Sequence, residues 1–121
     1  MALPANRSLS EGALTVSLVD ISTASSAFVV SPWRGTLKRW YSTISAAITT
    51  ANGSLSLEIN GTAVTGSTIT VTQSGSAAGD VDSAVTTGAN YVNEGDVIEV
   101  ITTGDCDTTS IGTFPIIIER D

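Results

Sequence analysis

Six acidic residues could bind a cation, because they lie in pairs within predicted turns: Asp80 and Asp82, Glu94 and Asp96, Asp105 and Asp107. Carboxylates at this spacing can chelate Ca²⁺ through hard oxygen ligands, and paired carboxylates can also serve glycoside hydrolysis. The EF-hand spacing, with its glutamate at the twelfth position, is absent. Aspartate is also common in turns because its side chain accepts hydrogen bonds from nearby backbone N–H groups. Solvated turns are therefore the simpler interpretation, with calcium binding as the alternative.

Nucleophilic catalysis has little support in this sequence. It contains no histidine, which excludes Ser-His-Asp and Cys-His catalysis and histidine metal ligands. The single cysteine, Cys106, lies between Asp105 and Asp107, and neighbouring carboxylates disfavour the reactive thiolate. A GxSxG nucleophile motif is also missing. We predict a protein that is not an enzyme, with no catalytic residues, no metal site and no cofactor, and regard a small hydrolase as the weakest alternative.

Residues 32–41 combine three of the five cations with three of the six aromatic residues of the chain. Tryptophan, tyrosine and arginine often anchor interfaces, because they bury large areas and still offer hydrogen-bond donors. With Arg7 added from the N-terminal segment, the predicted interface residues are Trp33, Arg34, Lys38, Arg39, Trp40, Tyr41 and Arg7. The alternatives are an ordinary strand with one aromatic residue in the core, or a phosphate-binding groove.

The composition indicates a protein that joins a larger assembly. The chain has 121 residues and a net charge of −7, and 14% of its residues are charged, against about 25% in typical soluble domains. Five cations on such an acidic chain disfavour nucleic-acid binding. No apolar run approaches the roughly 18 residues of a membrane span, and we read no secretion signal at the N-terminus. Because little of its surface can be charged, we expect oligomerisation or attachment to a partner.

Alternating patterns predict strands along most of the chain. Residues 14–19, 36–44 and 54–59 alternate with period two, and Asn60-Gly61 is a hairpin signal. In the segment 36–44 this alternation places Leu37, Arg39 and Tyr41 on one face.

Together these signals predict an all-β, single-domain antiparallel β-sandwich, jelly-roll-like, with about seven to nine short strands. An extended N-terminal arm is expected over residues 1–12 and the sandwich over 13–121, with a long loop at 73–90. An immunoglobulin-like sandwich is the rival, although the sequence lacks its cysteine pair.

Four segments resemble small capsid decoration (cement) proteins of tailed bacteriophages: residues 35–41, 59–62, 78–83 and 94–100, within a resemblance that covers roughly residues 35–119. This resemblance implies a jelly-roll or related β-sandwich without enzymatic activity. It further implies a homo-dimer or homo-trimer that binds the major capsid protein on the exterior of the virion, after synthesis in the host cytoplasm. The binding residues of such proteins vary between phages, so none is transferred to this chain.

The leading hypothesis is therefore a capsid decoration subunit that stabilises the shell by cross-linking major capsid subunits. It involves no nucleic acid and no membrane. Under this hypothesis, Arg39→Glu or Trp40→Ala weakens capsid occupancy and leaves the isolated fold largely intact. The alternative is a carbohydrate- or receptor-binding module of a phage fibre. Exposure of Trp33, Trp40 and Tyr41 on one flat face would favour sugar binding, because aromatic rings can stack on sugars.

Overall fold

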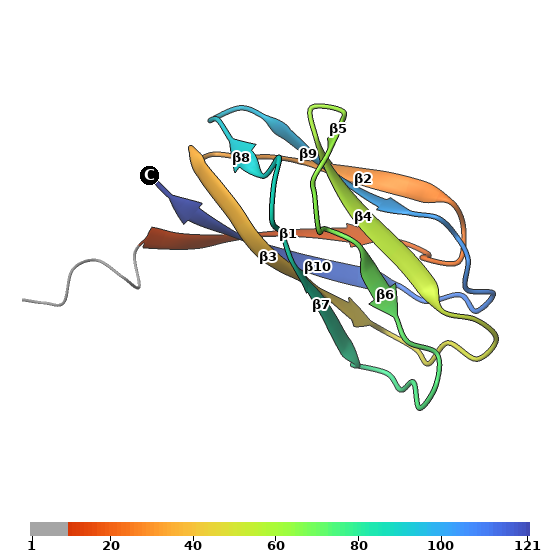
Figure 1. Ribbon diagram of the computed structural model, residues 1–121. Helices are drawn as coiled ribbons and strands as arrows, with labels where there is room; N and C mark the ends of the chain where they lie inside the picture. The colour runs from red at the N-terminus through yellow and green to blue at the C-terminus, as the bar shows by residue number, and fades with distance from the viewer. Residues whose placement is uncertain (1–9) are drawn as a thin grey trace, which may run out of the picture.

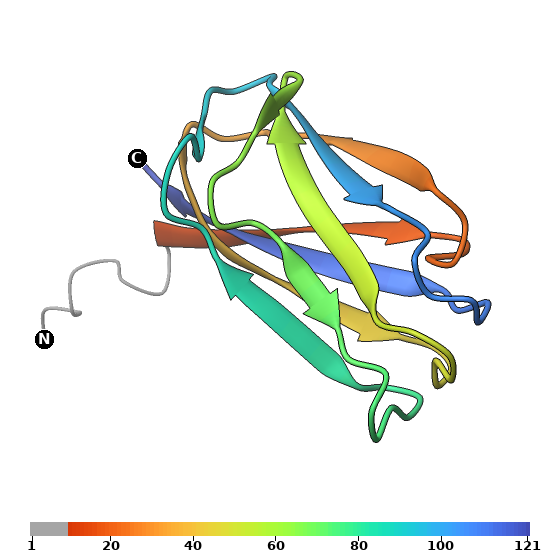
Figure 2. The same cartoon turned by 45° about the vertical axis from the view of Figure 1, so that its right-hand side comes forward.

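The computed structural model describes residues 10–121 as two antiparallel five-stranded sheets packed face to face (Figures 1 and 2). In sheet A, β1 pairs with β10, β10 with β3, and β3 with both β7 and β8; the bounds are β1 (Glu11–Leu18), β10 (Gly112–Arg120), β3 (Gly35–Ile44), β7 (Val81–Val85) and β8 (Tyr91–Val92). In sheet B, β2 pairs with β9, β9 with β4, and β4 with both β5 and β6; the bounds are β2 (Ser25–Val30), β9 (Val97–Thr102), β4 (Gly53–Ile59), β5 (Thr62–Ala63) and β6 (Ile69–Val71).

The predicted β-sandwich is confirmed. The chain crosses between the sheets after β1, β2 and β3, again after β6, and on either side of β9, as it does in a jelly roll. Residues 10–121 form ten strands, two of them only two residues long, so the expected seven to nine describes the longer ones. Strand β1 begins at Glu11, so Glu11 and Gly12 belong to the sandwich rather than to the predicted arm. Ser10 precedes that strand, and residues 1–9 of the predicted arm lie outside the described residues. Among residues 10–121, no helix is long and apolar enough to cross a membrane.

A β-bulge in β3 changes which of its side chains face the core. Leu37 pairs with Ile118 of β10, but the next pair joins Arg39 to Ile117, so Lys38 is the extra residue. A bulge of this kind reverses the inward and outward alternation of the strand. Leu37 and Trp40 are therefore both buried, in contrast to the predicted strand, which placed Leu37 on the same face as Arg39.

The predicted loop at 73–90 contains β7, so this expectation is corrected. Strand β7 pairs with β3 from Val85, opposite Arg39, to Val81, opposite Thr43. Its sequence, VDSAV, has few β-branched residues and resembles the Ser- and Ala-rich segments around it. It forms a strand because the backbone of β3 offers an unpaired edge to it, a long-range cause that local sequence does not carry.

Trp40 lies at the centre of the core between the sheets. Its side chain is fully buried, its ring centroid is 5.8 Å from that of Phe114, and the two ring planes are tilted by 54°. Its indole Nε1 donates a hydrogen bond of 2.7 Å to the backbone oxygen of Ser67. Trp40 is therefore a core residue that ties β3 of sheet A to the segment before β6 of sheet B, and it presents no side chain to a partner.

Gly35→Ala should destabilise the sandwich at the point where β3 begins. A Cβ atom at Gly35 would overlap the carbonyl oxygen of Glu119 and lie 2.9 Å from the Cα of Arg120. Because both contacts are backbone atoms of β10, strand separation must absorb the overlap, at a cost of about 1–3 kcal/mol or more. Chemical denaturation measures this loss. Gly88→Ala is the control, because its Cβ would meet Thr65 only at 3.4 Å; equal stability of the two variants would contradict the analysis.

Trp40→Ala should lower the free energy of unfolding by about 3–5 kcal/mol, because it empties a large buried volume. This outcome differs from the expectation, drawn from sequence, that the variant leaves the isolated fold intact. Trp40→Phe should cost less, about 1–3 kcal/mol, chiefly by leaving the Ser67 carbonyl without its donor. Equilibrium unfolding in denaturant checks both values. Tyr41→Ala is the matched control on the neighbouring residue. If Trp40→Ala lowers the free energy of unfolding no more than Tyr41→Ala does, a core role for Trp40 is contradicted.

Candidate functional site

The structure distributes the predicted interface residues among three places. Trp40 lies in the core. Arg39 and Tyr41 lie on the outer face of sheet A, with Lys38 exposed beside them at the bulge. Trp33 and Arg34 lie at one end of the sandwich, in the segment that joins β2 to β3. Arg7 lies outside the described residues. The cationic and aromatic segment is therefore not one surface, and two separate surfaces remain as candidate sites.

The outer face of sheet A is broad and contains few charged residues. Strand alternation and register direct these residues outward: Glu11, Ala13, Thr15, Ser17, Thr36, Arg39, Tyr41, Thr43, Val81, Ser83, Val85, Thr113, Pro115, Ile117 and Glu119. Three of them are charged: Glu11, Arg39 and Glu119. Val81 and Val85 are 60% and 69% exposed. Threonine, serine and aliphatic side chains dominate the rest of the face.

Arg39 is already paired on this face. Its Nη2 and Nη1 donate hydrogen bonds of 3.0 and 3.2 Å to the two carboxylate oxygens of Glu11, and its Nε donates one of 3.1 Å to the hydroxyl oxygen of Tyr41. Strand β10 lies between β3 and β1, so the guanidinium reaches across the face over that strand. The hydrogen bonds from Arg39 hold the pKa of Glu11 below its usual value, and the charges of Arg39 and Lys38 add to the effect. The same pairing, with Glu11 first and Tyr41 second, raises the pKa of Arg39.

This pairing changes what the face can bind. An exposed ion pair contributes little to stability, but it neutralises two of the three charges. The sequence places Arg39 among the cations of a predicted interface, whereas the structure commits it to Glu11 within the same chain. The side chain of Lys38 forms no hydrogen bond or ion pair with residues 10–121, so it is an unpaired cation beside the face. The outer face of sheet A is therefore suited to a largely neutral partner surface.

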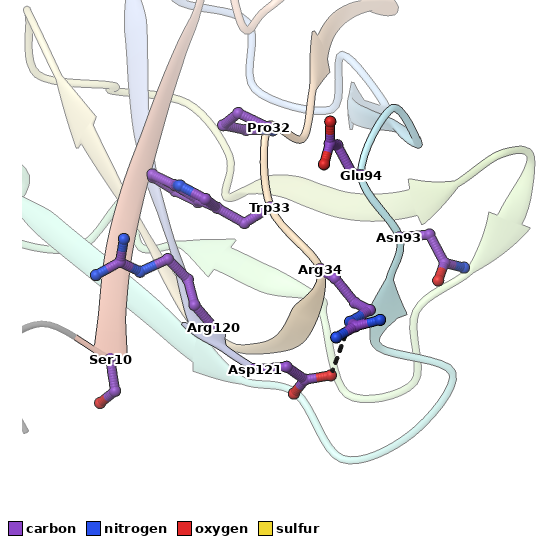
Figure 3. A pocket seen from close by; sticks show the side chains of 8 residues that line it. All are labelled: Ser10, Pro32, Trp33, Arg34, Asn93, Glu94, Arg120 and Asp121. Atoms are coloured by element: carbon purple, nitrogen blue, oxygen red, sulfur yellow. Dashed lines mark ion pairs between the residues drawn. The ribbon is translucent and has the colours of Figure 1, made fainter. Parts of the chain in front are cut away.

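The second candidate is an open pocket of about 950 Å³ at the end of the sandwich (Figure 3). Eight residues line it: Ser10, Pro32, Trp33, Arg34, Asn93, Glu94, Arg120 and Asp121. We call it the end pocket. Strand pairing brings its walls together, because Gly35 at the start of β3 lies opposite both Arg120 of β10 and Val92 of β8. Sequence reasoning found Trp33 and Arg34 but not the opposing residues, since only the register of β3 with its neighbours assembles them.

Trp33 forms the aromatic wall of the end pocket. Its ring packs over Gly12 of β1, where a Cβ atom would lie 2.5 Å from the six-membered ring. Arg120 lies beside it, with its Cζ 5.3 Å from the ring centroid, within the range of a cation–π contact. The Nε of Arg120 is buried and has no hydrogen-bond partner within residues 10–121. The Trp33 ring is thus half-buried and held in place rather than projecting freely.

The polar wall of the end pocket combines both signs of charge. Arg34 Nε lies 3.6 Å from an Asp121 carboxylate oxygen, and the Tyr91 hydroxyl donates a 2.6 Å hydrogen bond to the same oxygen. This hydrogen bond raises the pKa of Tyr91. The Glu94 side chain forms no hydrogen bond or ion pair with the described part of the chain, and in Figure 3 the backbone of residues 32–34 runs between it and the Trp33 ring. The pocket therefore offers a ring edge, guanidinium donors and a carboxylate acceptor.

In two of the predicted acidic turns, an aspartate accepts a hydrogen bond from a nearby backbone N–H. Asp80 accepts a 2.8 Å hydrogen bond from the Ala77 N–H, and Asp96 accepts one of 2.8 Å from the Asn93 N–H. The Asn93 N–H also holds the pKa of Asp96 below its usual value. Among residues 10–121, no three histidine, cysteine, aspartate or glutamate side chains form a group that could hold a metal ion.

Cys106 is buried rather than exposed in its turn. Burial is the main reason that the pKa of its thiol is raised, and the charges of Asp20 and Asp107 add to it. The sequence argument from neighbouring carboxylates therefore identified a real but secondary cause. A buried thiol of this kind is a packing residue.

No protein-family model matches the sequence, and no curated protein is similar to it. Solved structures share its fold. A family 35 carbohydrate-binding module from Clostridium thermocellum is 13% identical, with 84% of this chain and 90% of that one covered and a TM-score of 0.51. A chain of the acid-stable capsid of Helicobacter pylori bacteriophage KHP30 is 11% identical, with 88% and 91% covered and a TM-score of 0.50.

A third similar structure is much larger than this chain. The catalytic unit of an α-1,3-glucanase from Streptomyces thermodiastaticus is 12% identical, with 88% of this chain covered and a TM-score of 0.46. The match spans about a quarter of that protein, 26% of its chain. At these identities the likeness extends to the fold alone. The chain therefore has a β-sandwich fold that occurs both in a phage capsid and in carbohydrate-binding modules.

Proposed function

We propose that this chain is a virion structural protein, a capsid decoration subunit that docks on the outer surface of a phage shell through the outer face of sheet A. The observation that carries the proposal is the low free charge of that broad face, where Arg39 and Glu11 neutralise each other and leave Glu119 on the face and Lys38 beside it. Val81 and Val85 remain exposed there in a chain of net charge −7. Such a face gains free energy when a complementary neutral surface covers it.

The construction of the face supports this role. Its side chains stand on paired strands of one sheet, so they are held in place before binding and lose little conformational entropy on docking. A β-sandwich of this kind also occurs in the capsid of bacteriophage KHP30, so the fold is compatible with a role as a capsid component. In this proposal the partner is the major capsid protein, the location is the virion exterior, and synthesis takes place in the host cytoplasm. The chain acts by binding rather than by catalysis.

Val85→Asp and Tyr41→Ala should each weaken binding to the shell by about tenfold or more, because truncating or charging an interface anchor typically costs more than about 1 kcal/mol. Co-sedimentation with undecorated capsids of the phage that encodes this chain measures the effect. Thr70→Asp is the matched control, since it adds the same charge to an exposed strand position on the outer face of sheet B. Arg39→Glu should also weaken binding, because it places two carboxylates side by side at residues 11 and 39.

Unfolding curves separate loss of binding from loss of fold, because residues 41, 70 and 85 are at least partly exposed. Unchanged binding by Val85→Asp, Tyr41→Ala and Arg39→Glu together would overturn the assignment of this face. A larger loss for Thr70→Asp would transfer the docking surface to sheet B. Failure of the unaltered chain to bind the capsid at all would overturn the proposed function itself.

A second candidate function, carbohydrate binding, has one specific observation in its favour. The end pocket is lined by the Trp33 ring, Arg34 and the Glu94 carboxylate, which has no partner within residues 10–121, and such groups can stack on and hydrogen-bond to a sugar. The exposed platform of three aromatic residues that would favour sugars is not present, since Trp40 is buried and Tyr41 lies on the outer face of sheet A. Carbohydrate binding therefore ranks second.

If the end pocket binds a sugar, Glu94→Gln should weaken that binding by about tenfold, because it removes the charge from a hydrogen bond worth about 1.5–3 kcal/mol. A glycan array identifies a sugar, and calorimetry then compares the variants. Glu58→Gln is the control, a carboxylate on the outer face of sheet B. An array without any bound glycan, or equal affinity of Glu94→Gln and the unaltered chain, would contradict a sugar site in the end pocket.

A further inference from the structure

Strand β2 lies at the free edge of sheet B. Among residues 10–121 it pairs only with β9, and both views of the fold place it at the rim of the sandwich (Figures 1 and 2). The free side of an edge strand carries unpaired backbone N–H and C=O groups, which are a template for another strand. Proteins usually protect such edges with charged side chains, proline, bulges or very short strands.

Strand β2 has none of these protections. Its six residues, SSAFVV, contain no charge and no proline. It pairs with β9 without a register shift from Ser25, opposite Thr102, to Val30, opposite Val97. The other edges of the described sandwich differ. β1 carries Glu11 and exposes only small side chains beyond it, β7 contains Asp82, and β5, β6 and β8 have three residues or fewer.

The exposed side chains of β2 are large and apolar. Phe28 is 63% exposed and Val30 is 57% exposed, and both lie on the outer face of sheet B. Val97 and Ile101 of β9 lie half-buried beside them on the same face. An unprotected edge and an apolar surface therefore coincide along one strand.

Both ends of β2 are fixed in the fold. Before the strand, the Thr102 hydroxyl donates a 2.7 Å hydrogen bond to the backbone oxygen of Ile21. After it, the buried Ser31 donates a backbone hydrogen bond of 2.9 Å to Asp96 and accepts one of 2.8 Å from Gly95. An edge that is already held as a strand loses little conformational entropy when another strand adds to it.

We propose that β2 binds the same strand of a second copy of this chain, antiparallel and about a two-fold axis, so that the two B sheets join into one. A two-fold axis makes this contact self-complementary, because each copy offers the same residues. Paired residues in antiparallel strands share a face, and the register that sets Phe28 opposite its counterpart also sets Ser26 opposite Val30. The aromatic pair adds a favourable side-chain contact to the backbone hydrogen bonds.

Charge favours a second copy at this edge over one at another edge. Each copy has a net charge of −7, so a stable contact must keep carboxylates apart. The carboxylate nearest to β2 along its pairing with β9 is Glu99, opposite Phe28. In the joined sheet the two Glu99 residues are separated by three strand spacings, about 14 Å. This exceeds the Debye length of about 8 Å at physiological ionic strength, so their repulsion is largely screened.

The dimer also affects how the chain would dock on a shell. Only this step rests on the proposed function. A two-fold axis perpendicular to the joined sheet leaves both copies of sheet A on the same side of it. The two outer faces of sheet A then point in one direction, so a dimer can contact one shell at two places. Two linked contacts bind more tightly than one, because the second forms at a high effective concentration.

Light scattering at rising chain concentration tests the contact on the purified chain alone. The unaltered chain should reach twice the monomer mass, and Phe28→Lys should weaken the dimer by about tenfold or more, since a lysine on an edge strand opposes pairing. Val81→Lys is the matched control, a valine that is 60% exposed on edge strand β7. Hydrogen exchange should show β2 amides that become protected in the dimer and that Phe28→Lys exposes again.

A chain that stays monomeric at every concentration overturns the proposal. So does a dimer that survives Phe28→Lys, or one that Val81→Lys disrupts. Circular dichroism and unfolding curves verify that both variants keep the fold. If Phe28→Lys does not fold, Val30→Lys repeats the test on the same strand. Because these measurements use no capsid, and the capsid experiment uses variants of sheet A, either proposal can fail while the other stands.

Discussion

The β-bulge at Lys38 decides which side chains of the cationic and aromatic segment reach the core and which reach solvent. Leu37 pairs with Ile118 and Arg39 with Ile117, so one extra residue of β3 is accommodated there. The core consequently receives both Leu37 and Trp40, while Arg39 and Tyr41 stay outside on one face. Without the bulge, strict alternation would place Leu37 on the face of Arg39 and Tyr41, so Leu37 and Trp40 could not both be buried. The ion pair across sheet A and the tryptophan in the core thus depend on a single irregularity.

The strength of each local signal explains how far the sequence predicts the fold. Asn60-Gly61 forms the predicted turn, with φ angles of +49° and +83°, because few other residues accept those angles. The alternation at 54–59 is also a local signal, and it forms strand β4 as predicted. Strand β7 escapes prediction, because its pairing with β3 comes from a distant part of the chain. The bulge could not be predicted either, because Lys38 is not a residue type typical of bulges or turns. Only the register between β3 and β10 shows where the bulge lies.

The candidate sites follow the same division between local and long-range causes. Residue type predicted that Trp33, Arg34, Arg39 and Tyr41 matter, and all four lie at least partly exposed on the two candidate surfaces. Their neighbours could not be predicted, because Glu11 reaches Arg39 across β10 and Asp121 reaches Arg34 through the pairing of β3 with β10. Those carboxylates change the chemistry, since they turn an apparent cationic patch into neutral pairs.

This neutralisation sets the physical character of any association. With Arg39 paired to Glu11 and Arg34 close to Asp121, few free cations remain to attract an acidic partner. Apolar burial and backbone pairing are then the main favourable terms, and neither is weakened by screening. What salt does screen is the repulsion between chains of net charge −7. Added salt should therefore strengthen contacts between copies, whereas it would weaken an interface made by a cationic patch.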